Sequence, residues 1–128
     1  MTPSSRVYRI LVVDDDDDIV VNLQDILIDL GYCADIASNG ADALTLVDAH
    51  LYDVALVDFQ MPGMDGALLC QKIRARSETT VTFMITAEAK SDGIKRAMEA
   101  GTVEVLRKPV DMKRLLPLIQ QATTSSRP

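Results

Sequence analysis

The stretch ILVVDDDDDIVV, residues 10–21, joins four apolar residues to five consecutive aspartates before apolar residues resume. The apolar run is short and rich in β-branched residues, which is typical of a buried strand. Like charges repel one another, and crowding them beside a buried run lowers stability unless an opposite charge offsets them. The meaning of the acidic run therefore depends on what lies at the ends of the other strands.

Four further short apolar runs follow, each bounded by polar or turn residues. Together the runs predict five buried strands, at 7–13, 33–37, 54–57, 81–85 and 103–106. Apolar residues at helical spacing predict five intervening or following helices. Their marker positions are Ile19, Leu23, Ile26 and Leu30; Leu44, Val47 and Leu51; Leu69 and Ile73; Ile94 and Met98; and Met112, Leu115, Ile119 and Ala122. This alternation predicts an α/β fold with a doubly wound parallel sheet and helices on both faces.

Helix boundaries can also be read from single residues. Gly31 is expected just past the end of the first helix, and Ser38 or Asn39 at the start of the second. Pro117 falls inside the last helical pattern and removes one backbone donor. It is expected either to kink that helix or to delay its start.

Composition limits the possible functions. The 128 residues suit one domain, and 19 acidic against 13 basic residues give a net charge of -6, which disfavours a nucleic-acid-binding surface. No segment approaches the roughly 18 apolar residues of a membrane helix, and the first residues, MTPSSR, lack the apolar part of a signal peptide. Cys33 and Cys70 are expected to be buried, reduced thiols. These features predict a cytoplasmic protein that contacts neither membrane nor nucleic acid.

Ionisable and hydroxyl groups gather at the predicted strand ends. Asp14 and Asp15 follow the first strand, Asp58 the third, Thr86 the fourth and Lys108 the fifth. In open parallel sheets, ligands bind at the carboxyl ends of the strands. If the first strand lies beside the third, these groups share one crevice.

Such a crevice indicates a phosphoryl site. Clustered carboxylates stay ionised together only when a cation neutralises them, and oxygen ligands favour Mg²⁺, Mn²⁺ or Ca²⁺. A lysine ammonium and a divalent ion balance the charge of phosphoryl oxygens, and a threonine hydroxyl donates to one of them.

The remaining aspartates, Asp16, Asp17 and Asp18, are interpreted as helix-capping and solvated charges, because acids are favoured at helix N-termini. Asp14, Asp16 and Asp18 have the spacing of a calcium-binding loop, but Ile19 stands where that loop needs glycine and Asp25 where it needs glutamate. A calcium loop is therefore rejected.

The motifs ILVVDDD, VDFQMPGMDG, ITA and KP, in this order, resemble the receiver domain of bacterial two-component response regulators. The resemblance spans about residues 8–122, within a single domain taken as 1–128. It implies a flavodoxin-like fold whose five strands have the order 2-1-3-4-5.

The resemblance also implies a chemistry. Asp58 corresponds to the phosphoacceptor, which takes a phosphoryl group from the phosphohistidine of a sensor histidine kinase or phosphotransfer protein. Asp15, Asp58 and the backbone carbonyl of Gln60 would ligate Mg²⁺, with Mn²⁺ as an alternative, and Asp14 would act directly or through water.

Thr86 would bond the transferred group, Lys108 would pair with it, and the Lys108–Pro109 peptide bond is expected to be cis. Phosphorylation is expected to change the surface around strands four and five and helix four, moving Thr86 and the loop after it. Two positions depart from the family pattern, because Val105 and Val110 stand where aromatic residues are usual. This departure affects the expected coupling to an output rather than the chemistry.

Three functions remain open at this stage. The first is a phosphoaccepting switch, either a stand-alone protein or the receiver of a hybrid kinase or longer regulator. The second is a receiver that only docks to a partner. The third and weakest is an aspartate-nucleophile phosphatase for small molecules. Such phosphatases carry a second acid two residues after the nucleophile, where this chain has Gln60. The filled site positions disfavour a docking-only role.

Overall fold

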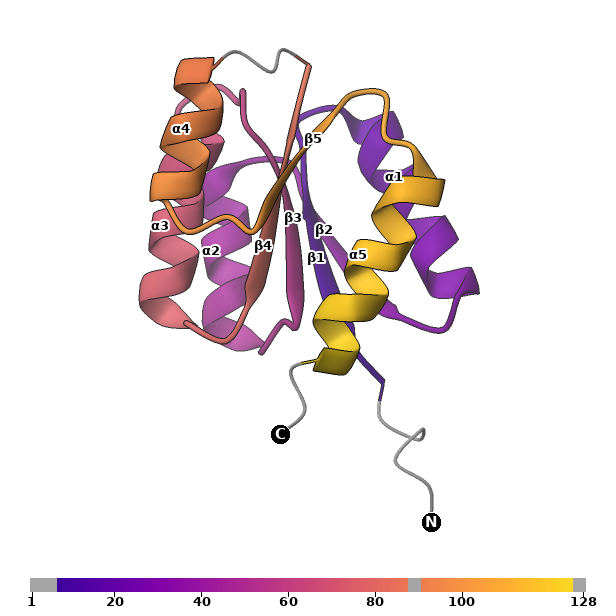
Figure 1. Ribbon diagram of the computed structural model, residues 1–128. Helices are drawn as coiled ribbons and strands as arrows, with labels where there is room; N and C mark the ends of the chain where they lie inside the picture. The colour runs from indigo at the N-terminus through magenta and orange to yellow at the C-terminus, as the bar shows by residue number, and fades with distance from the viewer. Residues whose placement is uncertain (1–6, 88–90, 126–128) are drawn as a thin grey trace.

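The structure, a computed structural model, describes residues 7–87 and 91–125. Strands and helices alternate along these ranges, and Figure 1 shows a central sheet between two layers of helices. In chain order the elements are β1 (Arg9–Val13), α1 (Asp17–Asp29), β2 (Cys33–Ala37), α2 (Gly40–Ala49), β3 (Val54–Asp58), α3 (Gly66–Arg76), β4 (Val81–Thr86), α4 (Ser91–Glu99), β5 (Glu104–Arg107) and α5 (Met112–Ser125).

The sheet has the expected topology. Its strand order is β2-β1-β3-β4-β5, and neighbouring strands pair in parallel. Helices α1 and α5 cover one face, and α2, α3 and α4 cover the other (Figure 1). Because β1 pairs directly with β3, with Val13 opposite Val57, the residues that follow these two strands lie next to each other.

Alternate residues of the strands fill two hydrophobic cores. In β1, Leu11 and Val13 pack in the core beneath α2, α3 and α4, whereas Ile10 and Val12 pack in the core beneath α1 and α5. Successive side chains of a strand point to opposite faces, and both faces are covered here. This explains why the strands read as continuous apolar runs instead of alternating patterns.

Helix ends follow local sequence signals. Asn39 precedes α2, and its side-chain oxygen accepts a hydrogen bond of 2.8 Å from the Asp42 amide. Gly31 lies just beyond α1 with φ of +97°, a left-handed conformation that glycine adopts without steric cost. Both predictions are confirmed.

Several element boundaries differ from the sequence-based expectation. The first strand begins at Arg9, and the last occupies Glu104–Arg107. Leu51 was expected in the second helix, but α2 ends at Ala49 and the Leu51 side chain is 81% exposed. The chain must return to β3 within a few residues, so His50 adopts an extended conformation and ends the helix.

The buried face of α4 also differs from the prediction. Ile94 and Met98 were expected to face the core, but they are 37% and 51% exposed, while Ala97 and Ala100 are buried. Small side chains allow the backbone of a helix to approach its neighbours closely, so a short helix can bury its alanines instead of its larger apolar residues. Met84 on β4, in contrast, is fully buried as expected.

Pro117 lies within α5, which begins at Met112. A delayed start is therefore excluded. The missing amide leaves the Lys113 carbonyl without its helical partner, and both residues are exposed, so water can satisfy that carbonyl.

Both cysteines are free thiols. Cys70 on α3 is fully buried, and burial raises the pKa of its thiol to about 12. Cys33 is only half-buried because β2 is an edge strand.

Within the described ranges, none of the helices combines the length and apolar character that a bilayer crossing requires.

The two methionines provide a test of the core assignment. Met84→Ala should lower the free energy of unfolding by about 2–5 kcal/mol, because it leaves a cavity in a packed core. Met98→Ala should change it by about 0.5 kcal/mol or less, because the side chain is mostly in solvent. Urea unfolding measures both, and equal losses for the two variants would contradict the described packing of α4.

Candidate functional site

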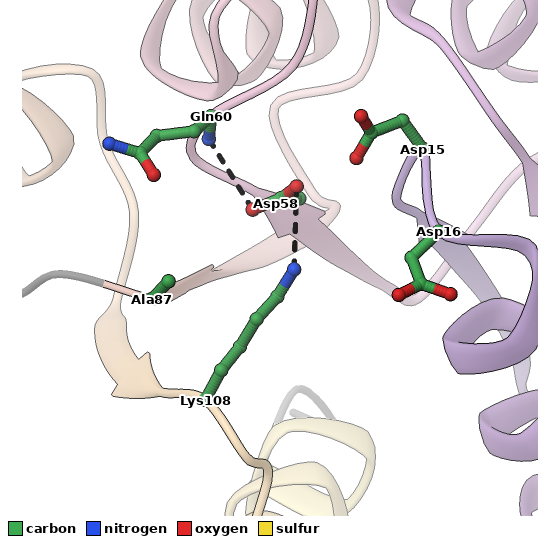
Figure 2. A pocket seen from close by; sticks show the side chains of 6 residues that line it. All are labelled: Asp15, Asp16, Asp58, Gln60, Ala87 and Lys108. Atoms are coloured by element: carbon green, nitrogen blue, oxygen red, sulfur yellow. Dashed lines mark hydrogen bonds and ion pairs between the residues drawn. The ribbon is translucent and has the colours of Figure 1, made fainter.

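Charged residues from three strand ends meet at one edge of the sheet. Asp14 follows β1, Asp58 ends β3 and Lys108 follows β5. The Lys108 Nζ atom lies 2.8 Å from an Asp14 carboxylate oxygen and 3.5 Å from an Asp58 carboxylate oxygen. Figure 2 shows the Lys108 side chain extending toward Asp58. The predicted crevice is therefore present.

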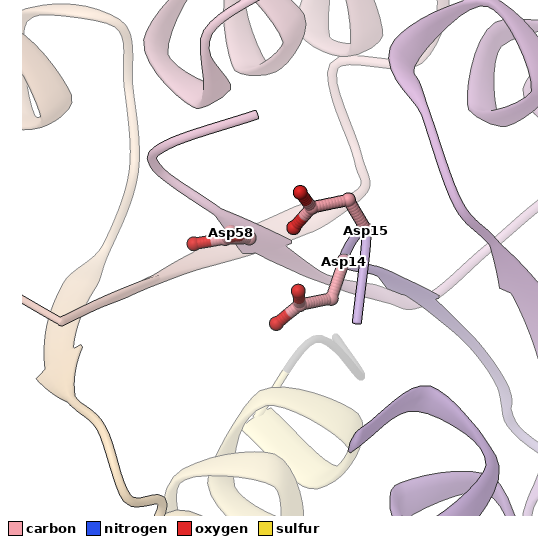
Figure 3. Close-up of side chains that lie close together, drawn as sticks. All are labelled: Asp14, Asp15 and Asp58. Carbon is pink, nitrogen blue, oxygen red and sulfur yellow. The ribbon is translucent and has the colours of Figure 1, made fainter. Parts of the chain in front are cut away.

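The three aspartates form a compact group. One carboxylate oxygen from each of Asp14, Asp15 and Asp58 lies within 4.8 Å of the others. Figure 3 shows the three side chains gathered at the ends of β1 and β3. Asp14 and Asp58 are 3% and 4% exposed, whereas Asp15 faces solvent. The group is thus open on one side.

Burial and mutual repulsion control the charge of this group. Burial, and next the neighbouring Asp14 charge, raise the pKa of Asp58 to about 6, although the Lys108 ammonium and the Gln60 amide oppose this. Burial alone would lower the pKa of Lys108, but its contacts with Asp14 and Asp58 outweigh burial and raise it. Lys108 therefore stays charged, and Asp58 titrates close to neutral pH.

Backbone amides hold the carboxylates in place. The Asp16 amide donates to Asp14 at 3.0 Å, and the Gln60 amide donates to Asp58 at 3.3 Å. Asp16 in turn caps α1, accepting from the amides of Asp18 and Ile19 at 3.0 and 3.3 Å. The acidic run therefore has two parts, with Asp14 and Asp15 in the charged group and the remaining three residues at the start of α1, as predicted.

A cleft of about 400 Å³ opens above these residues (Figure 2). Its lining residues are Asp15, Asp16, Asp58, Gln60, Ala87 and Lys108. Sequence reasoning treated Asp16 only as a helix cap and did not single out Ala87. Ala87 follows the end of β4 directly and Asp16 is the third residue after β1, so closeness to a strand end was the signal available.

Thr86 is not among the residues that line this cleft. It is 3% exposed and lines a separate cavity of about 10 Å³ together with residues that include Phe59 and Val105. Its neighbour Ala87 lines the cleft, and a role of Thr86 at the site stays a prediction. Residues 88–90, part of the loop expected to move on phosphorylation, lie outside the described residues.

The loop between β3 and α3 folds tightly against the end of β3. The Gly66 amide donates to the Phe59 carbonyl oxygen at 2.8 Å. A Cβ atom at Gly66 would lie 2.7 Å from the Phe59 Cα atom and closer still to the Asp58 carbonyl oxygen. Only glycine permits this approach, so the glycine holds the loop close to Asp58.

The Lys108–Pro109 peptide bond is cis, as expected.

Comparisons with known proteins agree with this fold. Residues 10–120 match the family model of the response regulator receiver domain. A response regulator receiver protein of Anaeromyxobacter sp. is 39% identical over 110 residues, covering 86% of this chain and 46% of the relative. An uncharacterised 14.6 kDa protein of Leptolyngbya boryana is 37% identical over 114 residues, covering 88% of this chain and 87% of the relative.

Solved structures agree as well. A CheY-like response regulator receiver domain protein of Methanospirillum hungatei has a TM-score of 0.91 and 28% identity, with 94% of this chain and 97% of that chain covered. The fold and these matches thus define a signalling module of two-component systems. The chain belongs to the response regulator receiver domain family. It spans about half the length of several curated relatives, such as the probable transcriptional regulator ycf27 of Cyanidium caldarium, of which it covers 47%.

The pKa of Asp58 predicts a pH-dependent stability in protein kept free of metal with a chelator. Because this pKa is about 6, above the roughly 4 of an exposed aspartate, folding favours the protonated form. This stabilisation is complete below about pH 4 and is lost as the pH rises through 6. Asp58→Asn should therefore stabilise the protein by about 2 kcal/mol at pH 7.5 and have little effect at pH 4. Urea unfolding at both pH values measures this, and equal effects at the two would contradict it.

Proposed function

We propose that this chain is a phosphoaccepting signalling switch, with Asp58 as the residue that takes the phosphoryl group. The observation that carries this proposal is the position of the Asp58 carboxylate, which lies at the cleft with a lysine ammonium 3.5 Å away. A carboxylate in such a place is accessible to a donor and is neighboured by a cation suited to phosphoryl oxygens. The donor would be a sensor histidine kinase or a phosphotransfer protein.

The proposed step is a direct phosphoryl transfer. A carboxylate oxygen of Asp58 forms a bond to phosphorus, while the bond from phosphorus to the donor's imidazole nitrogen breaks and its electron pair stays on the imidazole. Lys108, already between Asp14 and Asp58, would then pair with the phosphoryl oxygens. Thr86 would bond one of these oxygens, which requires it to turn from its small cavity toward the cleft.

The donor set fits a divalent cation. Three carboxylates that approach within 4.8 Å, one of them open to solvent, are hard oxygen ligands of the kind Mg²⁺ prefers, and Mn²⁺ would substitute. We infer that Asp14, Asp15 and Asp58 hold this ion together with the backbone carbonyl of Gln60. The bound ion would neutralise the negative charge that accumulates when a phosphoryl group meets these aspartates.

We further propose that the chain acts as one receiver module, with a core of about residues 8–122. Because it spans only about half of several relatives, its place as a free protein or as part of a hybrid kinase or longer regulator is a separate matter. Its output, its cytoplasmic location and the absence of direct nucleic-acid contact stay predictions. The surface that responds is expected around β4, β5 and α4.

The two alternative functions have less support. A docking-only receiver would have no need for a buried carboxylate with a pKa raised to about 6, held beside a lysine. A phosphatase for small molecules would need a general acid two residues after Asp58, but Gln60 cannot give up a proton. Neither alternative is favoured by a specific feature of the structure.

Incubation with acetyl phosphate and Mg²⁺ tests the phosphoacceptor. The wild-type chain should gain the mass of one phosphoryl group, and Asp58→Asn should gain none, because a neutral amide is a poor nucleophile. Asp17→Asn, which changes an exposed aspartate in the first turn of α1, is the matched control and should label like the wild type. Undiminished labelling of Asp58→Asn would refute the assignment.

Thermal melts with and without Mg²⁺ test the metal site. A ligand that binds only the folded state stabilises it, by about 2.7 kcal/mol at a concentration one hundred times its Kd. Mg²⁺ should therefore raise the Tm of the wild type, and Asp15→Asn should reduce that rise. Asp17→Asn should keep it, since Asp17 lies outside the carboxylate group. A Tm indifferent to Mg²⁺ would count against the site.

A further inference from the structure

Helix α4 contacts the residue that follows the proposed phosphoacceptor. Phe59 comes directly after Asp58, and the guanidinium carbon of Arg96 lies 5.5 Å from the centre of its ring. One turn earlier on α4, a Cβ atom at Gly93 would come within 3.3 Å of the same ring. Residues three apart on a helix share a face. The Phe59 ring therefore packs against the face of α4 that carries Gly93 and Arg96.

Arg96 also binds the far end of the same loop. Its Nη2 atom lies 2.5 Å from a carboxylate oxygen of Asp65, and the other carboxylate oxygen of Asp65 accepts from the Leu68 amide at 2.9 Å. Burial alone would raise the pKa of Asp65, but the Arg96 contact and the capped amides lower it. Asp65 is thus both the N-cap of α3 and the partner of a side chain on α4.

The two contacts of Arg96 enclose the loop 59–66. Phe59 begins this loop and Asp65 lies at its end, next to Gly66, whose amide bonds the Phe59 carbonyl oxygen. Gln60, whose carbonyl is the proposed metal ligand, lies between them. One side chain from α4 therefore holds both ends of the segment that carries Gln60 and begins beside Asp58.

The site also contacts α4 through Thr86 and Val105, where little free space is left. Val105 and Thr86 line a cavity of about 10 Å³, with Phe59 and α4 residues as its other walls. Valine is short and its χ1 angle is stiff, so it offers little movement on that side. The ring of Phe59 is larger and touches α4 directly.

We propose that Arg96 is a positioning residue for the Asp58 site, clamping the loop 59–66 through Phe59 and Asp65 and thereby coupling α4 to phosphorylation. This inference rests on the proposed function. A surface ion pair alone contributes little. Arg96 differs from an ordinary surface pair because its two contacts fix the two ends of one functional loop. Coupling between two sites is reciprocal. If the position of α4 changes the affinity of the loop for a ligand, binding of that ligand must change the position of α4 by the same free energy.

Two variants separate positioning from simple electrostatics. Arg96→Gln removes a positive charge near the site and Asp65→Asn removes a negative one, while asparagine keeps the N-cap of α3. Electrostatics alone predicts tighter Mg²⁺ binding for the first and weaker binding for the second. Positioning predicts weaker binding for both, by about two- to fivefold, the range expected of an exposed ion pair and a cation–π contact.

The matched control is Arg76→Gln. It breaks the exposed ion pair between Arg76 and Asp48, which measures 2.9 Å and joins α3 to α2 away from the cleft. Calorimetric titration gives the Mg²⁺ affinity of each variant, and this control should match the wild type. Tighter binding by Arg96→Gln would overturn the proposal.

A second readout needs neither metal nor phosphoryl group. Hydrogen exchange of the Gly66 amide, followed by NMR in a chelator, reports the closure of the loop through its bond to Phe59. Exchange should be about two- to fivefold faster in Arg96→Gln and unchanged in Arg76→Gln. Unchanged exchange in Arg96→Gln would refute the clamp whatever the fate of Asp58. If exchange responds but the wild type takes no phosphoryl group, the clamp stands and the proposed function fails.

Discussion

The ion pairs of Lys108 with Asp14 and Asp58 are the interaction on which the site depends. Two nearly buried carboxylates at neighbouring strand ends repel each other, and a buried charge is costly unless it is paired. Lys108 reaches them from β5, across the end of β4, which separates β5 from β3 in the sheet. Adjacent strands lie about 4.8 Å apart, so only a long side chain spans this gap. The small Ala87 at the end of β4 leaves room for it.

This balance is incomplete, because one ammonium cannot offset the charge of the whole group. One ammonium faces two carboxylates, with the exposed Asp15 close by, so the group retains net negative charge. Burial first, and repulsion by Asp14 second, raise the pKa of Asp58. Sites with a function often keep such unfavourable arrangements at the expense of stability. The same repulsion that weakens the free protein would favour a bound cation, because its positive charge offsets that of the carboxylates.

Two helices, α1 and α4, contact the residues around this charged group in different ways. Asp16 connects the carboxylates to α1 through local backbone hydrogen bonds, which leave little freedom. On the other side, α4 presents buried alanines to the core and leaves Met98 half exposed and Ile94 37% exposed, so few large side chains of this helix are fully buried. Its contacts with Phe59 and Asp65 are then a larger share of what holds it. A helix held in this manner is suited to respond to changes at the neighbouring loop.

Features that depend on near neighbours in the chain could be predicted from the sequence: five strands, a cap at Ser38 or Asn39, the capping role of Asp16, Gly31 beyond α1, and acidic, hydroxyl and lysine residues at strand ends. The strand order implied by the family resemblance then placed Asp14, Asp58 and Lys108 in one crevice, because it sets the first strand beside the third and parallel strands share one carboxyl end. Tertiary structure alone decided that Thr86 lies beside a separate cavity, that α4 buries Ala97 rather than Met98, and that Arg96 meets Asp65, 31 positions earlier in the chain. These outcomes depend on how closely a helix can approach the sheet. That distance is set by the packing of side chains from distant segments, and no local pattern encodes it.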